Sequence, residues 1–542
     1  MTDDLWKKYC SFYEKPFSEQ MQHNRETMDK YFKRWKTTDL AKMLHKGSVK
    51  TFKEIPITTY SDYPMLSEFG RRISKAIRRK PRRPGEPLKE YYDRISYEIG
   101  SSLNRYMVDP FFLCMKTTGT TGESKWIAHG RTFWKNFMDG TGVANFVICC
   151  SDGWGETKLK VGDAFLNLSA PIPYMSGYGI LAVSMAGFKC VPPIEVTDNL
   201  RDMREKFFLL LKVLRKEKVV AGGSVGSMFY MICKYLVEPY EFYQEYYRSM
   251  NFGLKKALLY LKLLQIKLSR REKKNIMDVM PLKGAVVAGM DSRLYMEFFK
   301  KEFGLQPLHV YGTTEGGCLM RGDPDRKADL VPDLKTSYME FKTEDGEIKE
   351  LDEIKKGEVY DLVITPFGSI LFRYDTEDLF RVIDFRDDGM PIFAFEGRKM
   401  EVIDLYNYRA TANVFVETLS RAGLRSSDKW AVVKIFKPRE HLLFLMEKTW
   451  PYSEREAEKI IFKALMETCR VMPNTARTLR DYVTEFRIKD PSEVVRVEYL
   501  KPGSFLRYSM IKAKEGAPLG QYKPPKIIPS EKIEIYEALK NA

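Results

Sequence analysis

Short apolar runs punctuated by glycine recur along this chain from Phe111 onward, with stretches of helical periodicity between them. Runs of about four to eight apolar residues bounded by turn residues are typical of strands buried in a sheet. Strands that alternate with helices predict an α/β fold, in which helices layer the sheets. The runs that carry this prediction are FFLCM at 111–115, DAFLNLS at 163–169, KGAVVAG at 283–289, PLHVYG at 307–312 and VYDLVITPFG at 359–368.

Helical patterns flank these runs. The first 60 residues predict helices that lead into an extended entry segment, Phe52–Pro64 (FKEIPITTYSDYP), and another helix is expected around Lys89–Leu103. Residues 201–275 are expected to be mostly helical, because their apolar residues recur three and four positions apart. Beyond a boundary near Gly397, mixed helix and strand signals predict a second, compact piece of about 140 residues.

The composition excludes several classes of protein. In 542 residues, 33 Phe, 31 Tyr and 7 Trp supply the apolar area of a folded core, which excludes a disordered chain. The uncharged stretch Ala164–Phe188 is broken by prolines and glycines, and the first residues have no apolar signal-peptide core, so neither a transmembrane segment nor a secretory signal is expected. Eight cysteines without C-x-x-C spacing predict reduced thiols. We expect a soluble, cytoplasmic chain.

The charge balance is basic, with 89 Lys and Arg against 73 Asp and Glu and a net charge of +16. This excess suits anionic ligands, such as nucleotides, or an acidic membrane surface. It is densest in the basic segment Arg71–Arg83 (RRISKAIRRKPRR), which is either a solvated helix face or a docking site for an anionic surface. A non-catalytic protein that binds such a surface is therefore one hypothesis. Nucleic acid is a disfavoured partner, because no recognition motif lies nearby.

The sharpest local feature follows the first apolar run, where Lys116–Lys125 reads KTTGTTGESK. Glycines let the backbone bend closely around an oxyanion, while amides and hydroxyls donate hydrogen bonds and a lysine adds charge. The spacing is not that of a Walker A loop, in which the lysine directly follows the last glycine. A plain tight turn is the alternative. The candidate phosphate-binding residues are Thr117, Thr118, Gly119, Thr120, Thr121, Gly122 and Lys125.

Two further segments follow predicted strands. In YGTTEGG, Tyr311–Gly317, an acidic side chain in a glycine-flanked turn can reach a hard cation such as Mg²⁺, and threonine hydroxyls can donate to a phosphate or carboxylate. The alternative is a capped turn with a solvated Glu315. In RYDTEDLFRV, Arg373–Val382, the Asp378 carboxylate suits ribose hydroxyls, the alternative being a salt bridge with Arg373 or Arg381. Ligands of open α/β sheets collect at strand carboxyl ends, so the three segments together indicate one ligand site.

In this order, KTTGTTGESK, YGTTEGG, RYDTEDLFRV and FEGRK resemble the core motifs of acyl-adenylate-forming enzymes. Within that superfamily, the chain is most similar to the auxin-responsive acyl-acid amido synthetases of plants and their prokaryotic relatives. The entry segment, residues 357–382 and the closing segment GAPLGQYKPPKI at 516–527 look like the corresponding parts of that family. The basic stretch 71–87 is not part of the resemblance, and LYNYRAT at 405–411 departs from it.

The resemblance implies a fold, a reaction and its substrates. The fold is a large N-terminal domain of layered β-sheets and helices at 1–396, a hinge at 397–400 and a small, mobile α+β domain at 401–542. With ATP and Mg²⁺, a carboxylic acid would form acyl-AMP and release pyrophosphate, and an amine, foremost an amino acid, would then displace AMP to give an amide. The alternative is an acyl-CoA ligase of the phenylacetate-CoA ligase type.

The same resemblance implies residue roles. Residues 117–122 with Lys125 would hold the β- and γ-phosphates, and Tyr311, Gly312 and Thr313 would form the nucleotide-binding turn. The remaining roles are Thr314 on the α-phosphate or the attacking carboxylate, Glu315 on Mg²⁺, Asp378 on the ribose, Arg398 on the nucleotide from the domain junction, and Lys523 as the cation that neutralises charge developing during adenylation.

Overall fold

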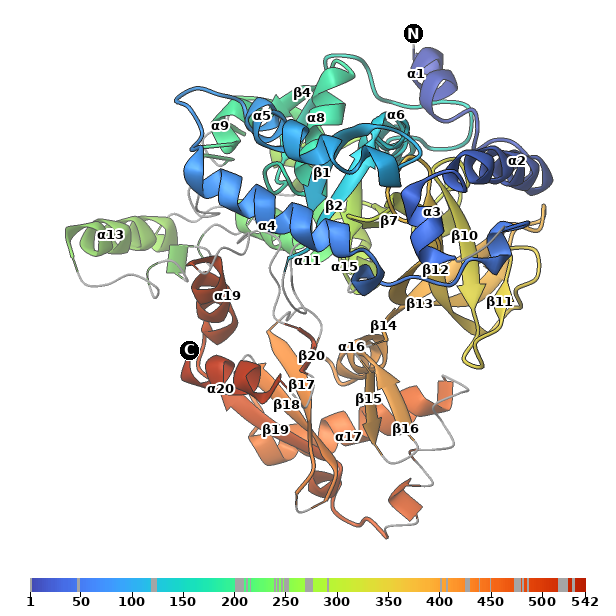
Figure 1. Cartoon of the computed structure of the whole chain (residues 1–542). Helices are drawn as coiled ribbons and strands as arrows, with labels where there is room; N and C mark the ends of the chain where they lie inside the picture. The colour runs from blue at the N-terminus through green and yellow to red at the C-terminus, as the bar shows by residue number, and fades with distance from the viewer. Residues whose placement is uncertain are drawn as a thin grey trace. The chain divides into compact units, whose positions relative to one another are not determined.

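The chain divides into two compact units (Figure 1). The first comprises Met1–Pro239, Arg271–Thr376 and Phe380–Phe395, and the second Tyr240–Arg270, Glu377–Leu379 and Glu396–Ala542. The computed structural model describes residues 2–542 except 46–48, 118–123, 200–208, 211–212, 215, 238–239, 241–242, 245–246, 248–252, 269–275, 290–291, 400–401, 406–407, 425–428, 438, 449, 472–478, 480–481, 485–486, 515–524 and 529–531.

The first unit contains a mostly parallel sheet, whose strands follow the order β4-β3-β5-β6-β7-β8-β9 in the described residues. Strands β3 to β7 pair in parallel, and β8 and β9 continue the sheet in antiparallel pairing. The carboxyl ends of the parallel strands therefore share one edge. The bounds are β3 Ala164–Asn167, β4 Lys189–Val191, β5 Val219–Val225, β6 Gly284–Ala288, β7 Leu308–Thr313, β8 Gly317–Arg321 and β9 Val331–Pro332.

A second sheet follows the order β11-β10-β12-β13-β14, and its residues belong to the first unit except 377–379 of β13 and 396–398 of β14. A β-hairpin, β1 Phe111–Lys116 with β2 Trp126–Gly130, is attached beside it, since Gly130 N donates to the Gly368 carbonyl at 2.7 Å and Ile370 N to the Ala128 carbonyl at 3.2 Å. The bounds of the sheet are β10 Ser337–Lys342, β11 Ile348–Lys349, β12 Val359–Pro366, β13 Tyr374–Phe385 and β14 Pro391–Arg398.

Amphipathic helices cover these sheets. In α4, Pro64–Arg79, the apolar side chains of Leu66, Phe69 and Ile73 are buried while the basic ones face outward, as the 3.6-residue period requires. Helix α4 packs on α5 and on β2 (Figure 1). The other helices of this unit are α1 Thr2–Tyr9, α2 Phe17–Trp35, α3 Asp39–Leu44, α5 Leu88–Ser101, α6 Arg131–Asn136, α7 Asn145–Cys149, α8 Met175–Met185, α9 Ile194–Thr197, α11 Gly226–Val237, α14 Ile276–Val279 and α15 Ser292–Phe303, with a π-helical turn at Phe137–Ala144.

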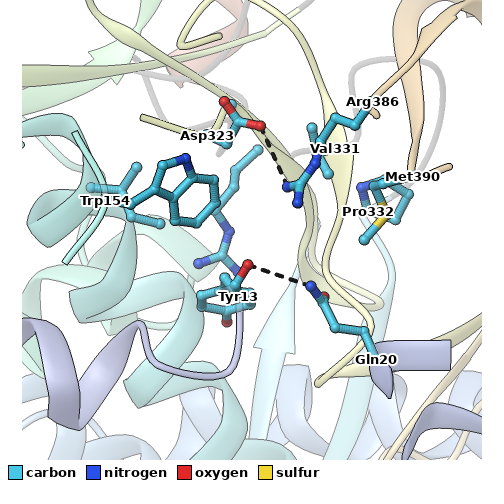
Figure 2. A pocket seen from close by; sticks show the side chains of 11 residues that line it. Tyr13, Gln20, Trp154, Asp323, Val331, Pro332, Arg386 and Met390 are labelled. Atoms are coloured by element: carbon cyan, nitrogen blue, oxygen red, sulfur yellow. Dashed lines mark hydrogen bonds and ion pairs between the residues drawn. The ribbon is translucent and has the colours of Figure 1, made fainter. Parts of the chain in front are cut away.

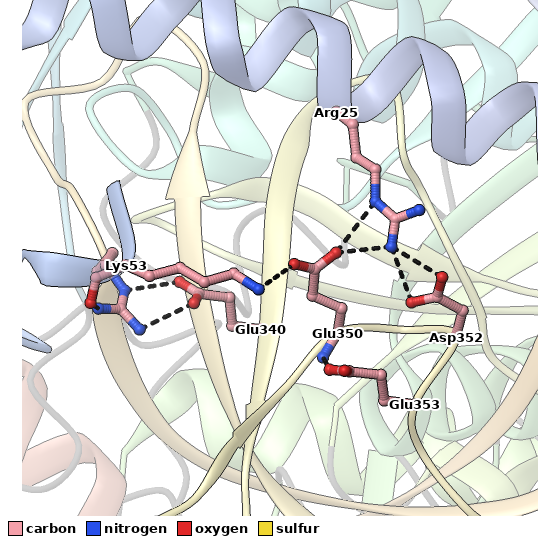
Figure 3. A network of polar contacts seen from close by, with 7 residues as sticks. Arg25, Lys53, Glu340, Glu350, Asp352 and Glu353 are labelled. Carbon is pink, nitrogen blue, oxygen red and sulfur yellow. Dashed lines mark hydrogen bonds and ion pairs between the residues drawn. The ribbon is translucent and has the colours of Figure 1, made fainter. Parts of the chain in front are cut away.

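A buried guanidinium fixes the entry segment against the second sheet. Arg373 makes two hydrogen bonds of 2.8 Å to the Glu340 carboxylate, and it also donates to the carbonyls of Lys53, at 2.9 Å, and Ile55. Lys53 Nζ in turn pairs with Glu350 at 2.6 Å (Figure 3). Burial raises the pKa of Glu340, and the charge of Arg373 opposes that rise. The network therefore joins three segments that are far apart in sequence.

The backbone of Arg373 is strained. Its φ of 45° lies in the left-handed region, which is costly for a residue with a side chain. Its carbonyl accepts from Thr58 N at 2.8 Å, and Asp375 N donates to the Thr58 carbonyl at 2.8 Å. The entry segment thus runs parallel to the start of β13 at Tyr374. These contacts and the Glu340 ion pair hold the strained conformation in place.

The second unit is built on a sheet of order β19-β18-β17-β20 and a hairpin, β15 with β16. Glu447, at the end of β18, is buried and accepts from Gly503 N at 2.8 Å and Phe505 N at 3.0 Å. A carboxylate in this position stabilises the start of helix α19. The bounds are β15 Val402–Leu405, β16 Tyr408–Thr411, β17 Trp430–Ile435, β18 His441–Glu447, β19 Val495–Leu500, β20 Ile527–Ile528, α13 Leu254–Leu268, α16 Ala412–Arg421, α17 Glu454–Val471, α19 Ser504–Lys514 and α20 Ile533–Asn541.

The structure confirms the expected α/β architecture and every strand predicted from an apolar run. The expectation that residues 201–275 are mostly helical is wrong at Val219–Val225, which form β5 inside the parallel sheet. Two glycines explain this strand. A Cβ on Gly223 would lie 2.6 Å from the Val286 carbonyl oxygen, and one on Gly222 2.8 Å from Leu166 Cβ, so close strand packing requires glycine there. Among the described residues, none forms a helix both long and apolar enough to cross a membrane.

We expect Glu340→Gln to lower the free energy of unfolding by about 3–5 kcal/mol, because it leaves the Arg373 guanidinium buried without its counter-ion. The control is Asp384→Asn. This change removes an exposed partner of Lys356, whose side chain is 63% exposed, and should cost less than about 1 kcal/mol. Urea denaturation followed by tryptophan fluorescence measures both changes. Equal effects of the two substitutions would show that the buried pair does not anchor the fold.

Candidate active site

The first group of candidate residues lies at the carboxyl edge of the parallel sheet. Tyr311, Gly312 and Thr313 end β7, and Thr314 and Glu315 form the turn into β8. A Cβ on Gly312 would lie 2.9 Å from the Gly317 carbonyl oxygen, which explains the glycine. The turn is closed by Gly316 N, which donates to the Thr313 hydroxyl oxygen at 3.1 Å. A loop of this kind at a strand end is where open α/β sheets bind ligands.

The loop KTTGTTGESK connects the two strands of the β1–β2 hairpin, and its base is fixed by two hydrogen bonds. Thr117 N donates to the Lys125 carbonyl at 2.9 Å, and Lys125 N to the Thr117 hydroxyl oxygen at 2.8 Å. The predicted phosphate-binding residues between them, Thr118, Gly119, Thr120, Thr121 and Gly122, lie outside the described residues. The described ends thus form a closed neck that presents this loop.

His129, on β2, joins that hairpin to the Thr314 turn. Its Nε2 lies 3.1 Å from the Thr314 carbonyl oxygen. Because a carbonyl only accepts, Nε2 carries the proton and Nδ1 holds a lone pair. The ring is fully buried and stacks on Phe133 with 3.7 Å between centroids, and burial lowers the pKa of His129 to about 3. A neutral histidine therefore ties the hairpin that bears the loop to the turn that bears Glu315.

Tyr60, in the entry segment, contacts the base of the loop. Its ring lies 5.1 Å from Lys125 Nζ, and its hydroxyl donates to the Trp126 carbonyl at 3.4 Å. Burial, and to a lesser extent the charge of Glu315, raise the pKa of Tyr60. Glu315 is half-buried and has no ion pair with any residue that the structure describes. A carboxylate in this state has coordination capacity for Mg²⁺, which takes few protein carboxylates and keeps phosphate oxygens and waters.

Aromatic packing places Tyr311 against the second sheet. Its ring lies 4.7 Å from that of Phe380 on β13 and 5.6 Å from that of Phe395 on β14, and those two rings lie 5.3 Å apart. At Phe380, β13 therefore lies beside the end of β7.

Asp378 and Arg398, both in the second unit, contact each other. Arg398 Nε donates to the Asp378 carboxylate at 3.0 Å, and the side chains are 39% and 3% exposed, respectively. The alternative salt bridge with Arg373 is not formed, because that guanidinium is bound to Glu340. The two residues predicted to bind the nucleotide are therefore adjacent, with the carboxylate buried and the guanidinium at the surface.

Lys523 lies outside the described residues, in the segment 515–524. The structure describes what flanks it. Helix α19 ends at Lys514, and Ile527–Ile528 form β20, which pairs in parallel with β17 at Val432 and Val433. Both flanking elements, α19 and β20, belong to the second unit.

One motif on the parallel sheet points to a different chemistry. Gly222–Gly226 reads GGSVG, which has the G-x-S-x-G spacing of a hydrolase elbow and lies where β5 turns into α11. Ser224 on β5 pairs with Val287 on β6, and Val287 pairs with His309 on β7. The backbones of Ser224 and His309 are therefore two strand spacings, about 10 Å, apart. His309 Nδ1 instead lies 3.2 Å from the Ala328 carbonyl oxygen. The geometry does not form a serine–histidine pair, which needs hydrogen-bond contact.

A small cavity elsewhere in the first unit is not the candidate site (Figure 2). Figure 2 shows Trp154 and Tyr13 on its walls and Arg386 facing Asp323, at 3.6 Å. Its volume of about 20 Å³ has room for a single water molecule. An acid substrate or a nucleotide would not fit there.

Comparisons with known proteins relate the central part of the chain to a known family. Residues 330–398, which run from β9 to β14 and include Arg373, Asp378 and Arg398, match the family described as the GH3 family central domain. We refer to these residues as the GH3 segment. No curated protein sequence matches the chain significantly. The GH3 segment is therefore the part of the chain that sequence comparison assigns.

Solved structures extend the likeness to almost the whole chain. A GH3.15 acyl acid amido synthetase matches with a TM-score of 0.63 and 16% identity over 96% of this chain and 93% of that one. A 2-hydroxyisobutyryl-CoA ligase in the postadenylation state, in complex with 2-HIB-AMP, matches with a TM-score of 0.58 and 12% identity over 97% and 93%. These matches confirm the predicted adenylate-forming fold around the GH3 segment.

Sequence reasoning missed His129 and Tyr60. Neither lies in a motif that singles it out, and five histidines and 31 tyrosines give no signal of their own. The position of His129 four residues after Lys125, at the end of the next strand, was the available hint. The role of His129 depends on its contact with Thr314, and that of Tyr60 on its contact with Lys125. Both contacts form only in the folded chain.

We expect acid to destabilise the protein through His129. Its pKa of about 3 in the fold lies below the ordinary 6.5. The contribution of the neutral side chain to the free energy of unfolding is therefore fully present above pH 6.5. That contribution is lost as the pH falls from 6.5 toward 3, at up to about 1.4 kcal/mol per pH unit. His129→Gln keeps an N–H donor but does not titrate. Between pH 6.5 and 5, the wild type should lose about 2 kcal/mol more stability than this variant in urea unfolding. Parallel pH profiles would contradict the assignment of a neutral, buried His129.

Proposed function

We propose that this chain is a ligase that activates a carboxylic acid with ATP as acyl-AMP and then transfers the acyl group to an amine, with an amino acid as the favoured acceptor. The observation that carries the proposal is the connection of the closed Thr117–Lys125 neck to the Thr314–Glu315 turn through His129 on the adjoining strand. The GH3 segment and the adenylate-forming fold support it.

The first half-reaction needs positioning and charge rather than a base. A carboxylate is already ionised near pH 7. Its oxygen attacks the α-phosphorus of ATP, the bond from that phosphorus to the bridging oxygen of the β-phosphate breaks, and pyrophosphate leaves with the bond electrons. The protein contributes by holding the phosphates in line and neutralising the charge that develops on them. Residues 117–122, Lys125 and Lys523 are the groups we assign to this task.

The remaining site residues orient the nucleotide. The Asp378 carboxylate would accept hydrogen bonds from ribose hydroxyls, and the exposed Arg398 guanidinium beside it would contact a phosphate. Thr314, held by His129, would donate its hydroxyl to the α-phosphate or to the attacking carboxylate. The half-buried Glu315 carboxylate would hold Mg²⁺, which would neutralise negative charge on the phosphates.

In the second half-reaction, the amine nitrogen attacks the acyl carbon, the carbon–oxygen bond to AMP breaks, and the ammonium formed loses a proton. We place the hinge for a movement of the small domain between the two steps at residues 397–400, where Gly397 has a φ of 132° that other residues rarely adopt. An acyl-CoA ligase is the alternative, because the fold is also that of a CoA ligase. All eight cysteines are free and buried, which supports a reducing compartment such as the cytoplasm.

The adenylation step predicts that labelled pyrophosphate exchanges into ATP only when an acid substrate is present. Lys523→Ala and Asp378→Asn should each slow this exchange about 100- to 1000-fold, as expected for the loss of a charged or hydrogen-bonding contact in the transition state. A panel of aromatic, fatty and jasmonate-like acids would supply the substrate.

The matched controls are Lys526→Ala, three residues after Lys523, and Asp384→Asn, on the same strand as Asp378. Lys526 Nζ stacks on the Trp430 ring at 4.4 Å, and Asp384 pairs with Lys356 at 2.9 Å. Both controls should exchange within about threefold of the wild type. Undiminished exchange in the two site variants would refute the residue assignments, and no exchange with any acid would count against the ligase itself.

The acceptor can be identified directly. With the acid found by exchange, the enzyme is given ATP and either CoA or each amino acid, and the product is weighed by mass spectrometry. We expect the mass of an N-acyl amino acid, formed with loss of one water from acid and amine. A product with the mass of an acyl-CoA thioester, and none with an amino acid, would replace the amide assignment with the alternative.

A further inference from the structure

Helix α4 and the turn after it carry a continuous basic face. Its members are cations that are all exposed, and we refer to them as the α4 basic face: Arg72, Lys75, Arg78, Arg79, Lys80 and Arg83. At 100° per residue, the four in the helix fall within a sector of about 120° and extend about 10 Å along the axis. The buried residues Leu66, Phe69 and Ile73 occupy the opposite sector. The positive charges therefore point away from the core in one direction.

None of these six side chains forms an ion pair within the described part of the chain, and Arg83 alone has a carboxylate, that of Glu86, whose pKa its charge lowers. The two nearest carboxylates in sequence are already engaged, because Glu68 pairs with Arg71 at 2.6 Å and Glu86 pairs with Arg94 at 2.7 Å. Arg82 differs from its neighbours, since it donates to the carbonyls of Glu86 and Asp198 and has a structural role. A surface with this many uncompensated cations is available to an anionic partner.

The fold restricts how such a partner can be bound. The apolar side of α4 is already packed in the core, so the helix has no free apolar face to insert into a bilayer. Residues 71–83 contain no aromatic side chain to stack on a base and no Asn or Gln to read one. What remains is a convex row of charges. It suits a flat array of anionic head groups that can be met in any register, with attraction that salt screens.

We propose that the α4 basic face docks this protein on an anionic phospholipid bilayer by electrostatic attraction alone. Docking leaves the candidate active site residues untouched, since none of them lies on α4. The proposal does not depend on the ligase assignment, because it rests on exposed charges and not on the reaction.

The test is co-sedimentation of the full-length protein with vesicles of phosphatidylcholine containing 30% phosphatidylserine, compared with pure phosphatidylcholine. We expect binding to the anionic vesicles at about 50 mM salt, loss of that binding at about 300 mM salt, and no binding to the neutral ones. The variant Arg72→Gln, Arg78→Gln, Arg79→Gln and Arg83→Gln should weaken the partition coefficient about 100-fold or more, because each basic residue near such a surface contributes several-fold.

The matched control is Lys30→Gln, Lys33→Gln, Lys300→Gln and Lys301→Gln, which removes four exposed charges from α2 and α15. It should bind like the wild type, and circular dichroism should show that both variants are folded. Equal loss in the two variants would mean that net charge, and not this face, drives binding, and would overturn the proposal. So would no binding of the wild type to anionic vesicles, or tighter binding to a labelled 30-nucleotide RNA that the α4 variant alone loses.

Discussion

The Arg373–Glu340 ion pair is the interaction on which the arrangement of the candidate site depends. The guanidinium is buried and must be compensated, and it uses its donors on a carboxylate of β10 and on carbonyls of the entry segment. In doing so it holds its own backbone in a left-handed conformation at the start of β13. The ion pair and the hydrogen bonds to the entry segment offset the free-energy cost of that conformation and of two buried charges. Glu350, which links Lys53 to Arg25 at 2.7 Å, extends the network to helix α2.

The same entry segment serves two purposes a few residues apart. Thr58 pairs with the backbone around Tyr374, and the Tyr60 ring lies 5.1 Å from Lys125 Nζ. A phosphoryl-transfer site works by positioning and charge neutralisation, so small displacements of its loops are costly. The entry segment and His129 limit such displacements from two sides. The neutral state of His129 suits this role, because a charged imidazole would be expensive to bury.

The basic character of the chain has more than one origin. Lys125 is a candidate phosphate-binding residue at the base of the KTTGTTGESK loop, whereas the cations of the α4 basic face point away from the core. Several other cations are consumed in structural pairs, such as Arg373 with Glu340 and Arg94 with Glu86. A net charge of +16 by itself therefore does not indicate one anionic partner. The position and pairing of each cation distinguish Lys125, a candidate phosphate-binding residue, from the α4 basic face, the proposed docking surface.

The sequence by itself determined the class of fold and the segments of the site. Apolar runs between glycines identified β1, β3, β6, β7 and β12, because a strand buried on both faces must consist mostly of apolar residues. Short glycine and threonine motifs after strands identified the loops. It did not determine β5, since a strand interrupted by Gly222 and Gly223 has no clear period, and close packing against β3 and β6 is what requires those glycines. Nor did it reveal that Asp378 pairs with Arg398 or that His129 holds Thr314. Local patterns arise from which side chains are buried, and they act over a few residues. Partners that are 20 or 185 positions apart are chosen only when tertiary packing brings them within hydrogen-bond distance.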